Sequence, residues 1–176
     1  MSPVTEIDSP AGVLTLRPER DEDKEFRYRL FCDSRQPEFA LLLAPPAYQQ
    51  VMAHQFHAQT VSYRTQFPHA RFDIIEMAGE PIGRLVVDRP GPMLHLIDQA
   101  IVPAQRNRGI GTAIMQALMD EARAANVPVR LEVSSQNDPS MRLYLRLGFV
   151  PVGHLHTYIE MEWPASAGAN EQKGVL

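Results

Sequence analysis

The sequence predicts an α/β domain in which a mixed β-sheet carries helices on both faces. Two patterns in the 176-residue chain lead to this prediction. After a first strand and two helical stretches, short alternating segments separated by turns are typical of antiparallel hairpins. The second half then alternates strand, helix, strand, helix and strand, which is the order of crossover units. A chain of this length is sufficient for one domain with its own hydrophobic core.

The individual elements follow from the spacing of apolar residues. Residues 1–12 carry no periodic pattern and are expected to form a loose lead-in. The expected strands cover residues 13–17, 71–77, 82–88, 93–102, 129–133, 149–152 and 157–163, and the expected helices cover residues 21–35, 47–66, 109–126 and 138–147. Residues 1–164 are therefore expected to form a single domain. The small and polar residues 165–176 are expected to be a disordered tail.

Residues typical of helix caps support two of these boundaries. Asn126 suits a left-handed cap at the end of the third helix. Asp138 followed by Pro139 suits an N-cap and a first helical position, and Gly148 suits the position just past the end of the same helix. These residues place the two later helices between the last strands of the sheet.

Composition and charge exclude several classes of function. The net charge of −4 argues against an extended basic surface for nucleic acid or for an anionic membrane. No apolar run approaches the ~18 residues of a membrane span, and the N-terminus lacks the features of a signal peptide. The lone Cys32 cannot form an intramolecular disulfide, which is typical of a reducing compartment. We therefore expect a cytoplasmic protein. The histidines come without the further ligands that a metal site needs, so no metal is expected.

A glycine-containing turn between a strand and a helix is the first chemical signal. Gly109 and Gly111 begin the helix, and the first N–H groups of a helix have no partners within it. These groups lie at the positive end of the helix dipole and suit a phosphate, to which Arg106 and Arg108 would add charge. The motif alone could equally form only a tight turn. It is not a dinucleotide fingerprint, because Ile114 stands where the third glycine would be.

A second group of residues follows the strand at 129–133. Asn137 lies just after the strand end, where its amide can contact an amide-rich ligand. Tyr144 lies seven residues further on, within a helix, and its phenol can donate a proton to a leaving group. The alternative for Tyr144 is an aromatic side chain that only packs on the sheet.

In combination, these motifs resemble the GNAT superfamily of acyl-CoA N-acyltransferases. The matching signature is Arg106-x-x-Gly109-x-Gly111, followed by Asn137, Leu143-Tyr144 and Gly148-Phe149. The resemblance covers residues 94 to about 163 well and the earlier residues only through the order of elements. It implies a GNAT-like, mostly antiparallel sheet of six to seven strands.

The resemblance also implies how acetyl-CoA binds. The turn would hold the pyrophosphate, the end of strand 93–102 would pair with the pantetheine arm, and this strand would splay from strand 129–133 to leave a slot for the thioester. The implied cofactor contacts are Ala100, Ile101, Val102, Arg106, Asn107, Arg108, Gly109, Ile110, Gly111, Thr112 and Asn137. Tyr144 would lie close to the thioester sulfur.

The implied activity is transfer of the acetyl group to a primary amine, of a small molecule or a peptide, by direct attack in a ternary complex. The amine must lose a proton first, and Asp98 and His95 are the candidate bases. In a regular strand these two residues face opposite sides of the sheet, whereas a bulge would change that. Asp98 could instead be an arginine-paired strand carboxylate, and His95 a packed strand histidine.

Two other functions are compatible with the same motifs. A catalytically silent acyl-CoA-binding module would share the phosphate turn and lack a working base. A transferase using a longer acyl-CoA would differ only in the pocket around the acyl group. Members of the family often form homodimers, so a second copy of the chain is a candidate partner beside acetyl-CoA and the amine.

Overall fold

The computed structural model describes residues 5–35 and 44–165 of the chain. One eight-stranded sheet has the strand order β1-β2-β3-β4-β5-β6-β8-β7. The strands are β1 (Thr5–Ser9), β2 (Gly12–Pro18), β3 (Arg71–Met77), β4 (Glu80–Asp88), β5 (Leu94–Ile101), β6 (Val129–Ser134), β7 (Val150–Leu155) and β8 (Tyr158–Trp163). The helices are α1 (Lys24–Ser34), α2 (Pro45–Gln66), α3 (Ile110–Ala125) and α4 (Asp138–Arg146), with short 3-10 turns at Asp21–Asp23 and Pro103–Gln105.

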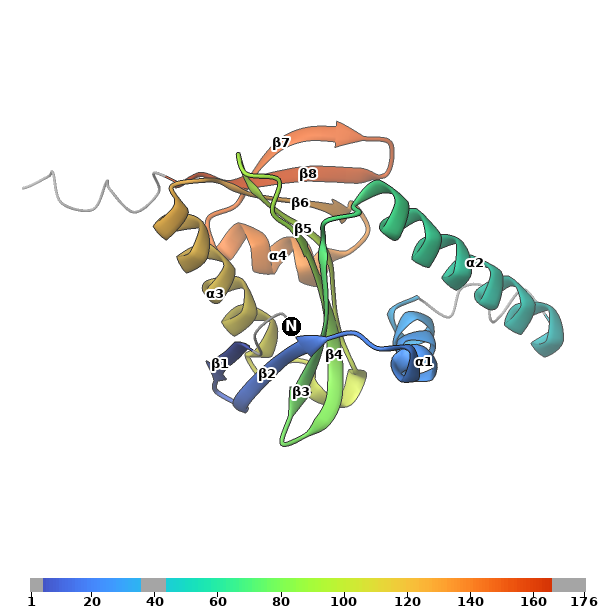
Figure 1. The fold of residues 1–176 in the computed structure, drawn as a ribbon. Coiled ribbons are helices and arrows are strands. Elements are labelled where there is room, and N and C mark those ends of the chain that lie inside the picture. The colour runs from blue at the N-terminus through green and yellow to red at the C-terminus, as the bar shows by residue number, and fades with distance from the viewer. Residues whose placement is uncertain (1–4, 36–43, 166–176) are drawn as a thin grey trace, which may run out of the picture.

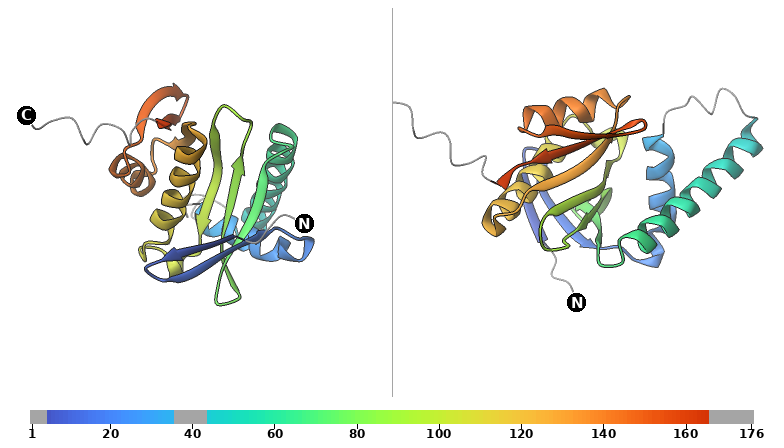
Figure 2. Two further views of the ribbon diagram at one scale, coloured as in Figure 1. Left: turned by 60° about the vertical axis from the view of Figure 1, so that its left-hand side comes forward. Right: turned by 90° about the horizontal axis from the view of Figure 1, so that it is seen from above.

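The sheet separates two pairs of helices. Helices α3 and α4 lie on one face, and α1 and α2 lie on the other (Figures 1 and 2). The main core fills the space between α3 and the sheet and includes the fully buried Ile114, Met115 and Leu131. Each such side chain contributes about 1.5–3 kcal/mol by leaving water. A smaller cluster of Phe31, Met52 and Phe56 joins α1 to α2.

The prediction of a loose lead-in over residues 1–12 is wrong for the described residues 5–12. Residues Thr5–Ser9 form β1, which pairs antiparallel with β2, so the sheet has eight strands instead of six to seven. The hairpin turns at Gly12, whose φ of 133° favours glycine, and the Ser9 hydroxyl donates to the Gly12 carbonyl at 2.6 Å. The sequence did not predict β1, because it is a polar, mostly exposed edge strand without apolar alternation.

The other predicted elements are present, with small shifts at their ends. The left-handed cap at Asn126 is confirmed by its φ of 53°. The N-cap of α4 is Asn137 instead of Asp138, because the Asn137 side chain accepts a hydrogen bond from the Ser140 N–H. Residues 166–176, most of the predicted tail, lie outside the described residues. Among the helices of the described chain, none is both long and apolar enough to cross a bilayer.

One pair of neighbouring strands, near the centre of the sheet, is parallel. Strands β1 to β5 are antiparallel neighbours, β5 and β6 are parallel, and β6, β8 and β7 are again antiparallel. A parallel pair needs a crossover, which α3 supplies. The sheet therefore consists of two antiparallel halves that meet at β5 and β6.

Candidate active site

The junction between the two halves of the sheet is open along most of its length. Strands β5 and β6 pair only at Leu94–Val129, His95–Arg130 and Leu96–Leu131. Beyond Leu96, β5 pairs only with β4, and beyond Leu131, β6 pairs only with β8. Backbone groups on the facing edges are thus left for another extended chain. This is the splay that the sequence resemblance implied.

The N-terminus of α3 lies at the open end of this junction. Gly109 is the N-cap, with a left-handed φ of 80°, and no side chain caps the helix. The first helical bond runs from the Ala113 N–H to the Gly109 carbonyl at 3.0 Å. The amide groups of residues 110–112 therefore precede the hydrogen-bonded ladder, which is the arrangement of an anion-binding helix end.

Gly111 shows that the helix start, β5 and α4 converge. A Cβ at this position would lie 3.4 Å from Nε2 of Gln99 in β5 and 3.8 Å from Leu143 in α4. The Gln99 amide donates to the Gly111 carbonyl at 3.4 Å, and its own buried oxygen has no hydrogen-bond partner among the described residues. The lack of a side chain at Gly111 keeps this convergence open.

The two arginines of the turn bond to the protein. Arg106 donates from Nε to the Ile101 carbonyl at 2.9 Å and from Nη2 to the Asp33 carbonyl at 3.3 Å. Arg108 donates to the side chain of Gln105. Arg106 thereby ties the turn to the end of β5 and to α1. In this conformation, both arginines bond within the protein, and the amides of residues 110–112 are the donors of the turn that precede the helical ladder.

Asn137 and Tyr144 lie in the α4 segment beside the open junction. The Asn137 side chain caps α4, which is a structural role that the sequence reading had not assigned to it. Tyr144 packs against the main core, with its ring centroid 5.6 Å from that of Phe149. Burial, with a smaller effect from the charge of Asp98, raises the pKa of Tyr144 to about 12. The phenol is therefore neutral across the physiological range.

Asp98 lies where β5 leaves β6. The register between β4 and β5 shifts between Val86–Asp98 and Val87–Leu96, so Ile97 is the extra residue of a β-bulge. The Asp98 carboxylate accepts from Nη1 of Arg84 at 3.4 Å, and the Asp98 side chain is 25% exposed. Burial raises its pKa, which Arg84 opposes. A raised pKa makes a carboxylate a stronger base, which suits proton abstraction.

The bulge also settles the relation between the two candidate bases. His95 and Asp98 both lie on the α1/α2 face. The His95 ring lies edge-on to Phe67 at the end of α2, with centroids 5.4 Å apart, and Asp98 contacts Arg84, which shares Glu19 with Arg27 of α1. His95, however, belongs to the paired section of the junction, opposite Arg130. The structure thus places Asp98 at the opening and His95 at its closed end.

Sequence reasoning missed several residues around Asp98. Arg84 approaches it from β4, and the charge of Asp98 contributes to raising the pKa of Tyr63, in α2, to about 12, although burial is the larger cause. No motif marks these residues, because only the fold brings them to Asp98. Among the described residues, no three His, Cys, Asp or Glu side chains gather as metal ligands would.

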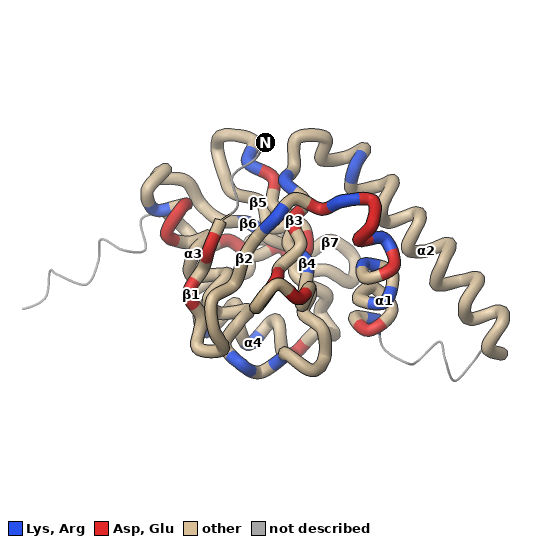
Figure 3. The backbone as a smooth tube through the Cα atoms, turned by 60° about the horizontal axis from the view of Figure 1, so that its bottom comes forward, with Lys and Arg blue, Asp and Glu red and all other residues tan. Residues whose placement is uncertain are grey.

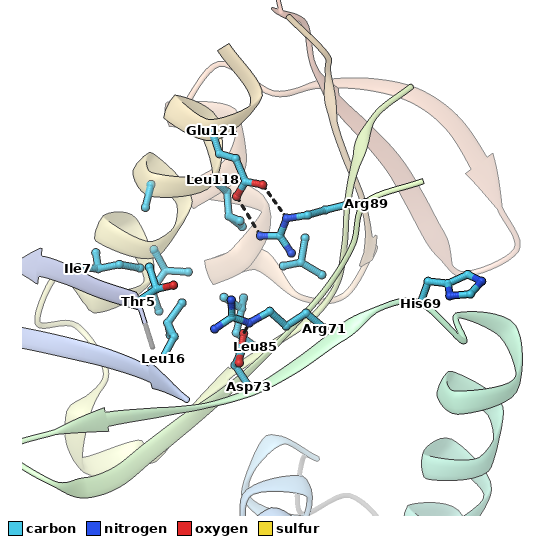
Figure 4. Close-up of a pocket in the computed structure, with 13 residues that line it drawn as sticks. Thr5, Ile7, Leu16, His69, Arg71, Asp73, Leu85, Arg89, Leu118 and Glu121 are labelled. Atoms are coloured by element: carbon cyan, nitrogen blue, oxygen red, sulfur yellow. Dashed lines mark hydrogen bonds and ion pairs between the residues drawn. The ribbon is translucent and has the colours of Figure 1, made fainter. Parts of the chain in front are cut away.

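A separate cavity of about 480 Å³ lies on the opposite face of the sheet, beside α3 (Figure 4). Its polar lining consists mainly of two ion pairs, Arg71–Asp73 at 2.6 Å and Arg89–Glu121 at 2.6 Å. None of the residues predicted for the site lines this cavity. The open junction, and not this cavity, is therefore the candidate active site.

Comparison with known proteins agrees with this assignment. The sequence profile of the Acetyltransferase (GNAT) family matches residues 15–149, and the chain belongs to this family. An N-alpha-acetyltransferase of Sulfurisphaera tokodaii is 38% identical over 66 residues, which are 36% of this chain and 40% of that protein. The N-alpha-acetyltransferase RimI of Mycobacterium tuberculosis is 32% identical over 97 residues, covering 52% of this chain and 59% of RimI.

Solved structures share the fold. The PaiA N-acetyltransferase of Thermoplasma acidophilum, solved in complex with coenzyme A, matches with a TM-score of 0.65 at 16% identity, over 86% of this chain and 98% of that one. RimJ of Mycobacterium smegmatis, in complex with CoA-disulfide, matches with a TM-score of 0.61 at 18% identity, over 93% and 87% of the two chains. At this level of identity, the likeness concerns the fold.

Proposed function

We propose that this protein is an N-acetyltransferase that moves the acetyl group of acetyl-CoA to a primary amine. The observation that carries the proposal is the parting of β5 and β6 next to the uncapped start of α3, with Asp98 at the parting. Membership of the GNAT family supports it. The matched segments span 40% and 59% of the two N-alpha-acetyltransferases, and their names suggest the α-amine of a peptide as the first acceptor to test.

In this proposal, acetyl-CoA lies along the open junction. The amides of Ile110, Gly111 and Thr112 hold the pyrophosphate, and the pantetheine pairs with the free edge of β5 at residues 99–101. Val102 donates its N–H to the Ile82 carbonyl in β4. Because successive residues of a strand point their backbone groups to opposite sides, the groups of Gln99 and Ile101 face the open side, where the Ile101 carbonyl already accepts from Arg106. Asn107 and Arg108 complete the turn at the surface.

Asp98 serves as the general base. An α-amine has a pKa of about 7.7–8.0 and a lysine amine about 10.4, so both are largely or partly protonated at neutral pH. Asp98 accepts one proton from the ammonium, directly or through a water, and the freed nitrogen attacks the thioester carbonyl to form the C–N bond. A backbone N–H of the β5 edge stabilises the resulting oxyanion, an effect of roughly 2.7–4 kcal/mol in other enzymes.

Tyr144 assists the departure of the thiol. Transfer of its proton to a thiolate whose conjugate acid has a pKa of about 8.5 is uphill by about 3.5 units, or roughly 5 kcal/mol, from a phenol with a pKa of about 12. Tyr144 is therefore proposed as a hydrogen-bond donor to the developing thiolate. As the C–S bond breaks, the nitrogen loses its second proton and the sulfur gains one. The products are the amide and free coenzyme A.

Calorimetric titration with acetyl-CoA tests the cofactor assignment, with desulfo-coenzyme A and ATP as controls. Release of free thiol with a panel of peptide α-amines and small primary amines then tests catalysis. Binding without thiol release in wild-type protein would favour the silent binding module. Turnover with propionyl- or succinyl-CoA above that with acetyl-CoA would favour a longer acyl donor.

The single free Cys32 supports a reducing compartment such as the cytoplasm.

The variant Asp98→Asn tests the base. It keeps the shape of the side chain and removes its basicity, so thiol release should fall by about 10²- to 10⁴-fold while acetyl-CoA binding persists. The matched control is His95→Asn, which should keep turnover within a few fold. Full activity of Asp98→Asn would assign the base to another group.

A further inference from the structure

A buried cluster of charges lies under α1, on the face of the sheet that α1 and α2 cover. The Glu19 carboxylate is 2% exposed and receives three guanidinium groups: Arg27 at 2.9 Å, Arg64 at 2.8 Å and Arg84 at 3.0 Å. Acidic and basic residues are interleaved along the chain from the end of β2 into α1 (Figure 3). Three positive groups against one carboxylate leave positive charge that Glu19 alone does not balance.

Arg84 connects this cluster to the junction. Its Nε donates to Glu19, its Nη1 reaches Asp98 at 3.4 Å, and its side chain is 5% exposed. The guanidinium also lies 5.6 Å from the centre of the Phe72 ring, over the neighbouring strand. These contacts hold Arg84 in one orientation, with one edge toward Glu19 and the other toward Asp98.

Stability alone does not account for this arrangement. Buried ion pairs contribute little net free energy, because desolvation offsets the attraction. Burial lowers the pKa of Arg27, which is the expected result of desolvation that its partners do not fully offset. Nη2 of Arg84 is also buried without a hydrogen-bond partner among the described residues. A fixed, positively charged group beside Asp98 can instead orient this carboxylate and influence its protonation.

We propose that Arg84 is a positioning residue for Asp98: anchored by Glu19, it fixes the carboxylate at the parting of β5 and β6. The positive charge of Arg84 favours the ionised form of Asp98, and the negative charge of Glu19 disfavours it. The proposal rests on the proposed function in one respect, since it takes Asp98 as the general base for the acceptor amine. The link between the three side chains does not depend on which acceptor is used.

The groups around Asp98 determine the direction in which each substitution should shift its pKa. Burial is the largest influence and raises the pKa of Asp98, Arg84 and Arg35 lower it, and Glu19 raises it. Tyr63 of α2 and Tyr144 of α4 are the phenols within its electrostatic reach, and both are neutral at physiological pH. Removal of Arg84 should therefore raise the pKa of Asp98, whereas removal of the Glu19 charge should lower it.

Carbon-detected NMR titration of ¹³C-labelled aspartate carboxyls in the full chain measures this directly, with Asp98→Asn to assign the signal. We expect the Asp98 midpoint to shift upward in Arg84→Gln and downward in Glu19→Gln. Arg84→Lys keeps a positive charge without the planar fork and should shift the midpoint less than Arg84→Gln. Arg89→Gln breaks a different arginine–carboxylate pair, on the other face, and should leave it unchanged.

Opposite shifts establish the control that the proposal assigns to Arg84. An unchanged midpoint in Arg84→Gln, or shifts of the same sign in Arg84→Gln and Glu19→Gln, would overturn it. If Glu19→Gln does not fold, because three arginines lose their carboxylate, Arg84→Gln and Arg84→Lys still decide the question. The test is separable from that of the proposed function: the midpoint reports on Arg84 without substrate, whereas thiol release by Asp98→Asn reports on the base.

Discussion

At the scale of single residues, the site depends on side chains whose chemistry is set by their surroundings. Asp98 and Tyr144 are ordinary residue types, and neither is unusual in the sequence. Burial raises the pKa of both, so the carboxylate becomes a better base and the phenol stays protonated. The sequence could identify Tyr144 through a motif. It could not place Asp98 and His95 relative to each other, because the faces on which they lie depend on a bulge.

The substitution Tyr144→Phe separates the chemical role of the phenol from its packing. The ring remains to pack against Phe149, so the fold and acetyl-CoA affinity should persist. Loss of the hydrogen bond to the leaving sulfur should lower kcat by about 10²-fold. Steady-state thiol release and calorimetry on the same samples give the two quantities. Unchanged kcat would reduce Tyr144 to a packing residue.

At the scale of elements, periodic segments were predictable and irregular ones were not. Strand β6 and helix α3 bury one clear face each, and their positions follow from apolar spacing. Strand β1 has no such spacing, because an edge strand needs only backbone pairing. The bulge at Ile97 was only an alternative in the sequence, because it depends on pairing with β4. The cap of α4 is a local bond from the Ser140 N–H to Asn137, and the sequence placed it one residue too late, at Asp138.

The two glycines at the start of α3 should respond differently to substitution. Gly109 has a φ of 80°, and a Cβ there would lie 2.9 Å from Pro10, so Gly109→Ala should lower the free energy of unfolding by about 1–2 kcal/mol or more. At Gly111 a Cβ would lie at contact distance from Gln99 and Leu143, so a methyl group fits there and a longer side chain would enter the convergence. Gly111→Glu should therefore keep stability and abolish acetyl-CoA binding, through bulk and through repulsion of phosphate.

Urea denaturation and calorimetry of both variants check this pair of outcomes. Gly111→Ala is the matched control for Gly111→Glu, since it adds only the methyl group that the space allows. Retained tight binding in Gly111→Glu would remove the phosphate from the start of α3. A fully stable Gly109→Ala would show that the turn adopts another conformation.

At the scale of the whole molecule, three residue pairs and one crossover helix join two antiparallel half-sheets. The proposed cofactor lies in the gap that these pairs leave, so it would bridge the halves as an added strand does. Such a ligand binds only the folded state. At 100 times its Kd, it should raise the free energy of unfolding by about 2.7 kcal/mol.

Hydrogen exchange locates this stabilisation within the fold. Without acetyl-CoA, the amides of Gln99 and Ile101 on the open edge of β5 and those of residues 110–112 lack partners across the junction and should exchange quickly. Acetyl-CoA should slow these amides and also those of β6 and α4, because the halves would then open together. Desulfo-coenzyme A, which shares the pyrophosphate and most of the pantetheine arm, should reproduce the protection without any reaction. Protection confined to residues 110–112 would mean that the ligand contacts the helix end alone and that the two halves of the sheet remain independent.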